Sequence, residues 1–172
     1  MTEFLTIKGS PTLEEVALLA GRVIDDSTRH AMKIAVARVS RWAGNEVRRR
    51  VASAVKVKGG IIKGRMFVGI TDEGGRVWLG LSPIKLNRLN PRKTASGVTA
   101  GPAKRPGAFI VEKFGGNVFQ RKGAARLPIE KSPGHEIREE GNAAIQSVQE
   151  LIGPRLLAEF ERALQWGRRK ST

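Results

Sequence analysis

The chain has no cysteine among its 172 residues, so neither a disulfide bond nor a thiolate metal site can form. It also has no tyrosine and only two histidines, His30 and His135, which lie far apart in the sequence. An imidazole metal site therefore lacks ligands, and we expect no metal or other cofactor. General acid–base catalysis needs titratable groups within reach of one another, and no serine stands in a G-x-S-x-G elbow. We expect no enzymatic activity and no small-molecule substrate.

Long hydrophobic runs are also lacking. No apolar run approaches the roughly 20 residues that a membrane span requires. The N-terminal residues show no basic region followed by an apolar run, so no signal peptide is expected. We therefore expect a soluble protein that is made in the cytoplasm and does not enter a membrane. The apolar fraction of 40% is somewhat low for a compact globule, which suggests that neighbouring subunits order part of the chain.

Acidic residues are scarce relative to basic ones. The chain carries 31 Lys and Arg against 16 Asp and Glu, a formal net charge of +15. This balance favours polyanions or strongly acidic partner surfaces and carries no information about the fold. The length fits a single domain with a core of its own.

Helical periodicity is clearest in the region 28–54 and again from 138 to about 167. The first of these regions has one apolar stripe, which we expect to pack on a sheet: Met32, Ala35, Val39, Trp42, Ala43, Val47 and Val51. The arginines on its other faces are either solvated or directed at nucleic acid or an acidic neighbour. In the second region, Pro154 is expected to break or kink the helix. A shorter strand (4–8) and helix (13–24, with a Thr12–Glu15 capping box) are predicted in an N-terminal arm.

Strand signals occupy the middle of the chain. Residues 65–70 and 76–81 flank turn-forming residues and predict a hairpin, with Trp78 expected in the core. Residues 108–111 and 118–121 flank Gly115-Gly116-Asn117 and predict a second hairpin, with Phe109 on its inner face. Pro128 lacks an N–H group, so it belongs on a sheet edge or just beyond one. We expect an α+β fold: long N-terminal helices, an antiparallel sheet of about four to six strands and a kinked C-terminal helix.

The expected single domain has three parts: an N-terminal arm and short helix (1–26), the long helix with the sheet (27–137), and the C-terminal helix with a basic tail (138–172). Residues 85–126 hold ten Lys or Arg against one acid, Glu112, a local balance of +9. The stretch 90–105 is interrupted by Pro and Gly and is too long and polar for a tight hairpin loop. Either it is a solvated surface loop or it contacts a partner.

Three motifs in this order resemble the minor tail protein Z family of lambda-like tailed phages. They are V-W-L-G-L-S-P-I-K-L-N-R-L at 77–89, G-A-F-I at 107–110 and V-F-Q-R-K-G-A-A-R-L-P-I-E at 118–130. With the long helix before them, the resemblance covers roughly Arg29 to the C-terminus. One departure follows the last motif: the family usually shows a Gly-Pro step, and this chain has Ser132-Pro133-Gly134-His135.

The resemblance implies a structural virion protein that completes a long tail at the head–tail junction. It implies a homo-oligomer, most plausibly a hexameric ring around the DNA path, that meets tail terminator, tail tube or head-connector proteins. The motif positions are architectural in kind. Those assigned to subunit packing are Phe109, Phe119, Arg126, Leu127, Pro128 and Ile129.

The basic stretch supplies the second group of candidate site residues. They are expected to face either the DNA channel or an acidic surface of a neighbouring ring: Lys85, Arg88, Arg92, Lys93, Lys104 and Arg105. Charge without a readout element predicts sequence-independent attraction of phosphates, weakened by salt. The alternative function is therefore a basic nucleic-acid-binding protein that acts alone. A chaperone that is absent from the finished particle is a further alternative.

Overall fold

The computed structural model describes residues 26–71, 74–123 and 125–170. The elements, in chain order, are α2 (Asp26–Ala54), α3 (Gly59–Lys63), β1 (Met66–Thr71), β2 (Gly74–Leu79), the 3₁₀ turn η1 (Leu86–Leu89), β3 (Arg92–Thr94), β4 (Gly97–Ala100), β5 (Ala103–Pro106), β6 (Ala108–Val111), η2 (Glu112–Phe114), β7 (Asn117–Arg121), β8 (Ile129–Lys131) and α4 (Arg138–Lys170). The predicted strand at 4–8 and helix at 13–24 lie outside the described residues.

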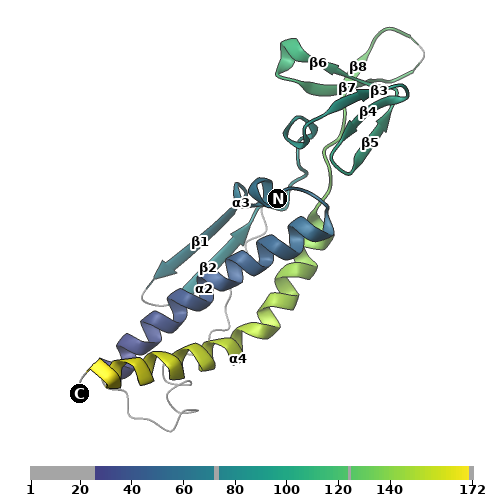
Figure 1. Cartoon of the computed structure of the whole chain (residues 1–172). Coiled ribbons are helices and arrows are strands. Elements are labelled where there is room, and N and C mark those ends of the chain that lie inside the picture. The colour runs from purple at the N-terminus through teal and green to yellow at the C-terminus, as the bar shows by residue number, and fades with distance from the viewer. Residues whose placement is uncertain (1–25, 72–73, 124, 171–172) are drawn as a thin grey trace.

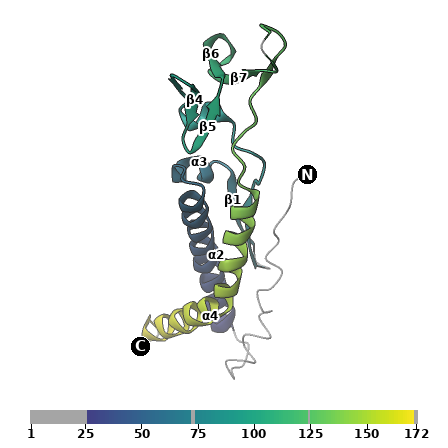
Figure 2. The same cartoon turned by 90° about the vertical axis from the view of Figure 1, so that its right-hand side faces the viewer.

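The elements form an elongated molecule with two parts (Figure 1). We call residues 26–81 and 138–170 the body, residues 85–131 the head, and the two segments that join them, 82–84 and 132–137, the neck. In the body, α2 and α4 lie side by side, and the β1–β2 hairpin packs on α2. Figure 2 shows the head at one end of the molecule and the C-terminal end of α4 at the other.

The apolar stripe predicted for α2 is buried, apart from Trp42, which is half-buried. Towards the start of α2, this stripe packs against Phe160 and its apolar neighbours on the second half of α4. Farther along, Val47 and Val51 join a second cluster with Val77 and Leu79 of β2. The small residues in the stripe let the elements approach closely. A Cβ atom on Gly44 would lie 2.5 Å from Cγ2 of Val68 in β1.

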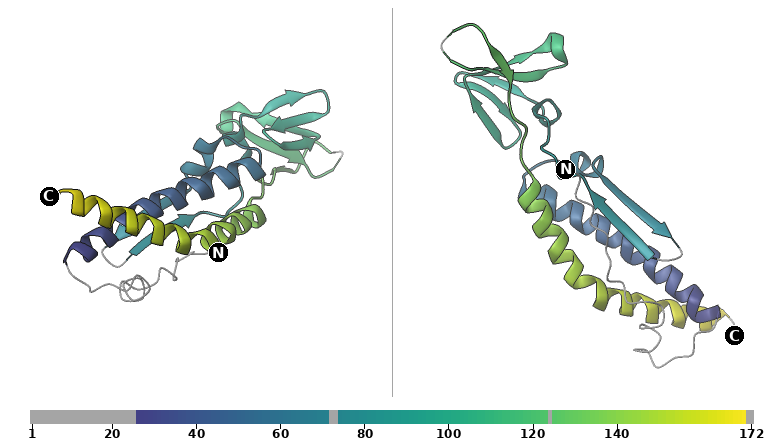
Figure 3. Two further views of the ribbon diagram at one scale, coloured as in Figure 1. Left: turned by 60° about the horizontal axis from the view of Figure 1, so that its bottom comes forward. Right: turned by 180° about the vertical axis from the view of Figure 1, so that it is seen from behind.

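The hairpin β1–β2 forms where the sequence predicts it, with Val68 opposite Val77 in antiparallel register. The side chains that face α2 are Val77 and Leu79, which are buried. Trp78 points to the other face because successive residues of a strand alternate in direction. It is half-buried, so its assignment to the core is wrong. Figure 3 shows the hairpin beside α2 from behind the view of Figure 1.

The neck consists of two antiparallel segments that are held by backbone and side-chain hydrogen bonds. Ile84 N donates to His135 O and His135 N donates to Ile84 O, each at 2.8 Å. Ile84 and Ile137 are fully buried, so the apolar core continues from the body into the head. Arg65 braces the first segment by donating to Gly80 O at 3.2 Å and to Ser82 Oγ at 2.6 Å. Burial, with a smaller effect from Arg88, lowers the pKa of Arg65.

The head contains two three-stranded antiparallel sheets, in the orders β3-β4-β5 and β6-β7-β8. The α+β class is confirmed, although the strands form three small sheets rather than one. The stretch 90–105, expected as a loop, is largely folded into β3, β4 and β5. Its short strands are separated by turns, and their Gly and Pro residues hid the strand pattern.

The C-terminal helix runs without interruption through Pro154. Figure 1 shows that α4 bends along its length, as expected for a helix that contains a proline. The prediction of a kink is therefore confirmed, and a break is not observed. None of the helices in the described residues is long and apolar enough to cross a membrane.

Candidate interaction surface of the head

The two sheets of the head share an apolar core that orients their polar faces outward. Its buried members come from η1 and from both sheets: Leu86, Leu89, Val98, Ala100, Ala103, Ala108 and Val118. In β4, the burial alternates, with Val98 and Ala100 inside and Gly97 and Thr99 outside. The strand period of two residues then fixes which side chains of the neighbouring strands reach the surface.

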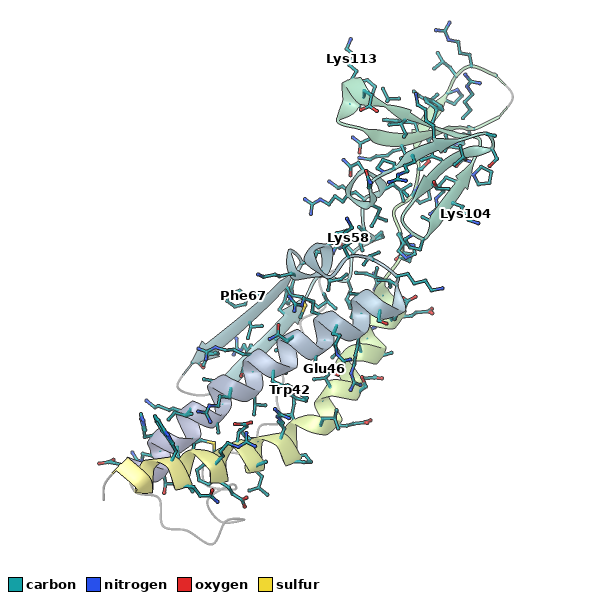
Figure 4. The ribbon with its side chains drawn as sticks, viewed as in Figure 1. Trp42, Glu46, Lys58, Phe67, Lys104 and Lys113 are labelled. Carbon is teal, nitrogen blue, oxygen red and sulfur yellow. The ribbon has the colours of Figure 1, made fainter. Side chains whose placement is uncertain are left out.

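Basic side chains outnumber acidic ones in the head by eleven to two. The two acids are Glu112 and Glu130, and Glu130 forms an ion pair with Lys122 at 2.8 Å. Lys104 and Lys113 project from different sides of the head (Figure 4). The positive charge is therefore distributed around the head rather than gathered in one groove, and it is exposed to solvent for most of these residues.

Two of the residues predicted to contact DNA or an acidic partner are brought together on one face. Arg92 of β3 and Lys104 of β5 both pair with Thr99 of β4, so the three side chains lie in one row on the outer face. Neighbouring strands are about 4.8 Å apart, which puts the backbones of Arg92 and Lys104 about 10 Å apart. This is close enough for both side chains to reach the same stretch of a phosphate backbone.

The other predicted contact residues are arranged differently. Three of them are exposed but lie outside that row. Lys85 lies at the start of η1, Arg88 lies within η1 and Lys93 lies on β3. Arg105 is half-buried and turned towards the neck. Its Nη2 donates to Gly134 O at 3.2 Å and to Pro133 O at 3.4 Å. Arg105 therefore holds the second neck segment, and its contact with DNA or an acidic partner stays a prediction.

The outer face of the second sheet is aromatic. Phe109 of β6 lies directly opposite Phe119 of β7, with 6.5 Å between the ring centroids. Phe114 of η2 lies 5.8 Å from Phe119, and the Arg121 guanidinium lies 5.9 Å over the Phe109 ring. The inner side of this sheet is instead formed by Ala108 and Val118, which are buried. The prediction that Phe109 lies on the inner face is therefore wrong.

The remaining residues assigned to subunit packing also lie on the surface. Ile129 pairs with Arg121 and therefore shares the outer face with Phe119. Arg126, Leu127 and Pro128 precede β8 and are exposed, and Leu127 keeps 68% of its surface accessible. Pro128 lies directly before the edge strand β8, as its missing N–H group predicts. We call Phe109, Phe114, Phe119, Arg121, Ile129 and Lys131 the aromatic face.

The described residues contain no group of three or more His, Asp or Glu side chains that could hold a metal ion. A cavity of about 280 Å³ lies where the neck meets the head. The residues that line it include Lys85, Asn117, Lys131 and Ser132 but no acid and no histidine. This cavity brings together no pair of groups suited to general acid–base catalysis.

Two features of this surface were missed by sequence reasoning. The neck arginines, Arg65 and Arg105, stand in basic stretches that give no sign of which guanidinium groups turn inward. The outward direction of Phe109 was missed because residues 108–111 are all apolar and show no alternation. Searches for related proteins found nothing similar: no family model, no curated protein and no solved structure matches this chain.

Proposed function

We propose that this chain is a structural virion protein that completes the long tail of a phage at the head–tail junction. In this proposal it forms a homo-oligomer, most plausibly a hexameric ring, around the DNA path. The ring meets the tail terminator, tail tube or head-connector proteins and touches DNA by charge only. The observation that carries the proposal is the head itself, where eleven basic residues stand against two acidic ones and most of these residues are exposed.

The position of the motifs in the fold supports this proposal. The W-L-G-L-S-P-I motif spans the end of β2 and the first neck segment. G-A-F-I begins one residue before β6 and covers its first three residues, and R-L-P-I-E leads into β8. The residues that carry the resemblance therefore converge on the neck and the head.

The secondary structure that carries the positive charge of the head also supports a structural role. Sequence-specific readers place a helix or a β-ribbon with dedicated side chains in a groove of the duplex. Among the described residues of the head, the only helical elements are the 3₁₀ turns η1 and η2, of four and three residues. Exposed cations attract phosphates regardless of sequence. This suits a channel or a ring contact through which any DNA must pass.

The test has two measurements. Mass spectrometry of purified particles from the phage that encodes the chain is expected to detect the protein. Native mass spectrometry of the purified protein is expected to give one ring-sized oligomer that persists at high salt. Absence from the particle would reject the virion role in favour of an assembly factor, and a protein that is monomeric at every concentration and salt would reject the ring.

A second function is favoured by one specific observation, the row of Arg92, Thr99 and Lys104 on the outer face of the first sheet. No acid of the head takes part in this row. A basic nucleic-acid-binding protein that acts as a monomer would use it to bind duplex DNA with steep salt dependence. Fluorescence anisotropy with labelled duplexes of unrelated sequence separates the two functions. Tight binding by a monomer at moderate salt favours the second.

A further inference from the structure

We propose that the aromatic face of the head binds the outer stripe of α4 in a second copy of this chain. We define the outer stripe as the exposed residues Glu139, Ala143, Gln146, Glu150, Pro154, Leu157 and Glu161. The inference rests on the proposed function, because it names the contact that joins the copies of the homo-oligomer.

The rings of the aromatic face lie outside both apolar clusters of the described residues. Its rings contact each other and Arg121, and neither Phe109 nor Phe119 belongs to the apolar core of the head. Phe114 keeps 54% of its surface accessible. The apolar centre is bordered by cations, because Arg121 and Lys131 pair with Ile129 and Phe119 on the same face. A partner for this face must supply apolar side chains together with acids.

The outer stripe of α4 has these properties. Its members recur at spacings of three and four residues, so they share one side of the helix, and all of them are exposed. Three are glutamates and none is basic, in a chain whose net charge is +15. Leu157 adds an apolar side chain that is 40% exposed. The stripe is therefore an acidic and partly apolar strip on a basic molecule.

The aromatic face is long enough to cover about half of the outer stripe. The stripe runs over 23 residues of helix, about 33 Å at 1.5 Å per residue, whereas the longest strand of the sheet, β7, has five residues and spans about 17 Å. The sheet offers three strands and the adjoining η2. Packing a helix against the face of a small sheet is an ordinary way to bury both. Pairing Arg121 and Lys131 with glutamates would compensate charges that would otherwise repel between neighbouring heads.

The two surfaces of one molecule cannot meet each other. The neck separates the β6-β7-β8 sheet from the body, and α4 runs away from the head along its whole length (Figures 1 and 3). The contact must therefore join two copies. Because the two surfaces differ, the contact is heterologous, and repeating it gives a closed ring or an open filament. This is the geometry that the proposed ring requires.

The absence of cysteine allows a direct test by cross-linking. Phe114→Cys marks the aromatic face and Gln146→Cys marks the outer stripe without changing a charge. Under mild oxidation, an equimolar mixture of the two full-length variants is expected to give a disulfide-linked dimer. Each variant alone is expected to give none, since each copy then carries only one half of the contact. Dimers in either single preparation, or none in the mixture, would overturn the proposal.

A charge-reversal experiment provides the second test and separates this inference from the proposed function. The variants are Arg121→Glu with Lys131→Glu on the face, and Glu139→Lys with Glu150→Lys on the stripe. Each double variant alone is expected to lose the oligomer at low salt. A double variant of the opposite sheet, Arg92→Glu with Lys104→Glu, is the matched control and is expected to keep the oligomer.

The outcomes are distinct. The four-fold variant that carries both sets of reversals is expected to regain the oligomer, because the opposite charges face each other again. If all variants keep a ring-sized mass, the ring stands and the contact proposed here is wrong. If reversal of the face abolishes binding of a labelled duplex and leaves the native mass unchanged, the face binds nucleic acid instead. Detection in the particle tests the proposed function independently of these results.

Discussion

Glu159 of α4 and Arg38 of α2 form an ion pair across the two long helices, with 3.4 Å between Oε2 and Nη1. Oε1 of the same carboxylate accepts a hydrogen bond from Arg162 Nη1 at 2.6 Å and lies 3.7 Å from Arg155 Nη2. Its side chain is only 8% exposed, so three guanidinium groups compensate one largely buried carboxylate. The Arg155 guanidinium also lies 5.1 Å over the ring of Trp42. These contacts fix the pairing of α2 and α4 far from the head.

Removal of the carboxylate charge should therefore destabilise the body. We expect Glu159→Gln to lower the free energy of unfolding by about 1–2 kcal/mol, because three cations lose their shared acceptor. The loss stays below that of a fully buried pair because the arginines are themselves about half exposed. Urea denaturation followed by circular dichroism measures the change. Glu136→Gln, at an exposed glutamate outside both long helices and the outer stripe, is the control and is expected to have little effect on stability.

A second prediction concerns the close approach of α2 to the hairpin. Alanine is the better helix former by about 1 kcal/mol, so Gly44→Ala would stabilise an isolated helix. In the folded protein the new Cβ atom would lie 2.5 Å from Cγ2 of Val68, and β1 would have to shift. We expect a net loss of about 1–3 kcal/mol, which is the usual cost of overpacking. A thermal melt that shows unchanged or increased stability would contradict this account.

The control for this prediction is Gly167→Ala on α4. Apart from its chain neighbours and the backbone of its own helix, the described residues place no atom within 4 Å of a Cβ atom at Gly167, so the substitution changes helix propensity without a clash there. We expect stability to stay the same or to rise by a few tenths of a kcal/mol, since the position is near the end of the helix. The two glycine substitutions are thus expected to change stability differently, which separates the cost of the clash at Gly44 from the gain in helix propensity.

The sequence predicted the elements better than their assembly. The stripe on α2, the β1–β2 hairpin and the β6–β7 hairpin were predictable because their periodicity and turn residues are local signals. The division of the strands into three sheets was not, because it depends on which strands pair across long separations. The bridge between Ile84 and His135, which defines the neck, joins residues that no local pattern connects.

The candidate surface was likewise only partly predictable from the sequence. Net charge identified the basic region, and Arg92 and Lys104 do share a face, because their strands pair with β4. The same composition could not show that Arg105 turns towards the carbonyl groups of Pro133 and Gly134. Whether an arginine serves a partner or the fold depends on the segment beside it in space. That segment lies 28 and 29 residues further along the chain.

A third prediction concerns acid stability. Hydrogen bonds from Arg49 and Arg50 hold the pKa of Glu46 at about 2, below its ordinary value of 4.5. Between these values the unfolded chain binds the proton more readily, so the stabilising contribution of Glu46 is present above about pH 4.5 and is lost as the pH falls towards 2. We expect the melting temperature to fall over this interval, and we expect Glu46→Gln to make the fall less steep.

Thermal melts from about pH 7 to about pH 2.5 measure this effect. Glu136→Gln is the control, because Glu136 is an exposed glutamate that lies outside both the arginine cluster and the outer stripe. It is expected to leave the steepness of the acid dependence unchanged. An identical profile for Glu46→Gln and the natural chain would show that the arginine pair does not contribute to stability.

The last prediction tests what the row of Arg92 and Lys104 does for phosphate binding. Each phosphate contact contributes a slope of about −0.9 to the dependence of log K on log salt concentration for duplex DNA. Arg92→Gln combined with Lys104→Gln is therefore expected to reduce the magnitude of the slope by about 2 and to weaken binding equally for unrelated duplex sequences. Fluorescence anisotropy over a series of salt concentrations gives both quantities.

Lys63→Gln is the control, because Lys63 is an exposed cation of the body on α3. It is expected to change the slope little, since α3 lies on the other side of the neck from the row (Figure 1). An equal loss of slope in both variants would mean that DNA responds to the net charge of the whole molecule. A loss confined to Arg92 and Lys104 would mean that the outer face of the first sheet is where phosphates lie. In a ring, that face would then be directed at the DNA path and the aromatic face at the neighbouring copy.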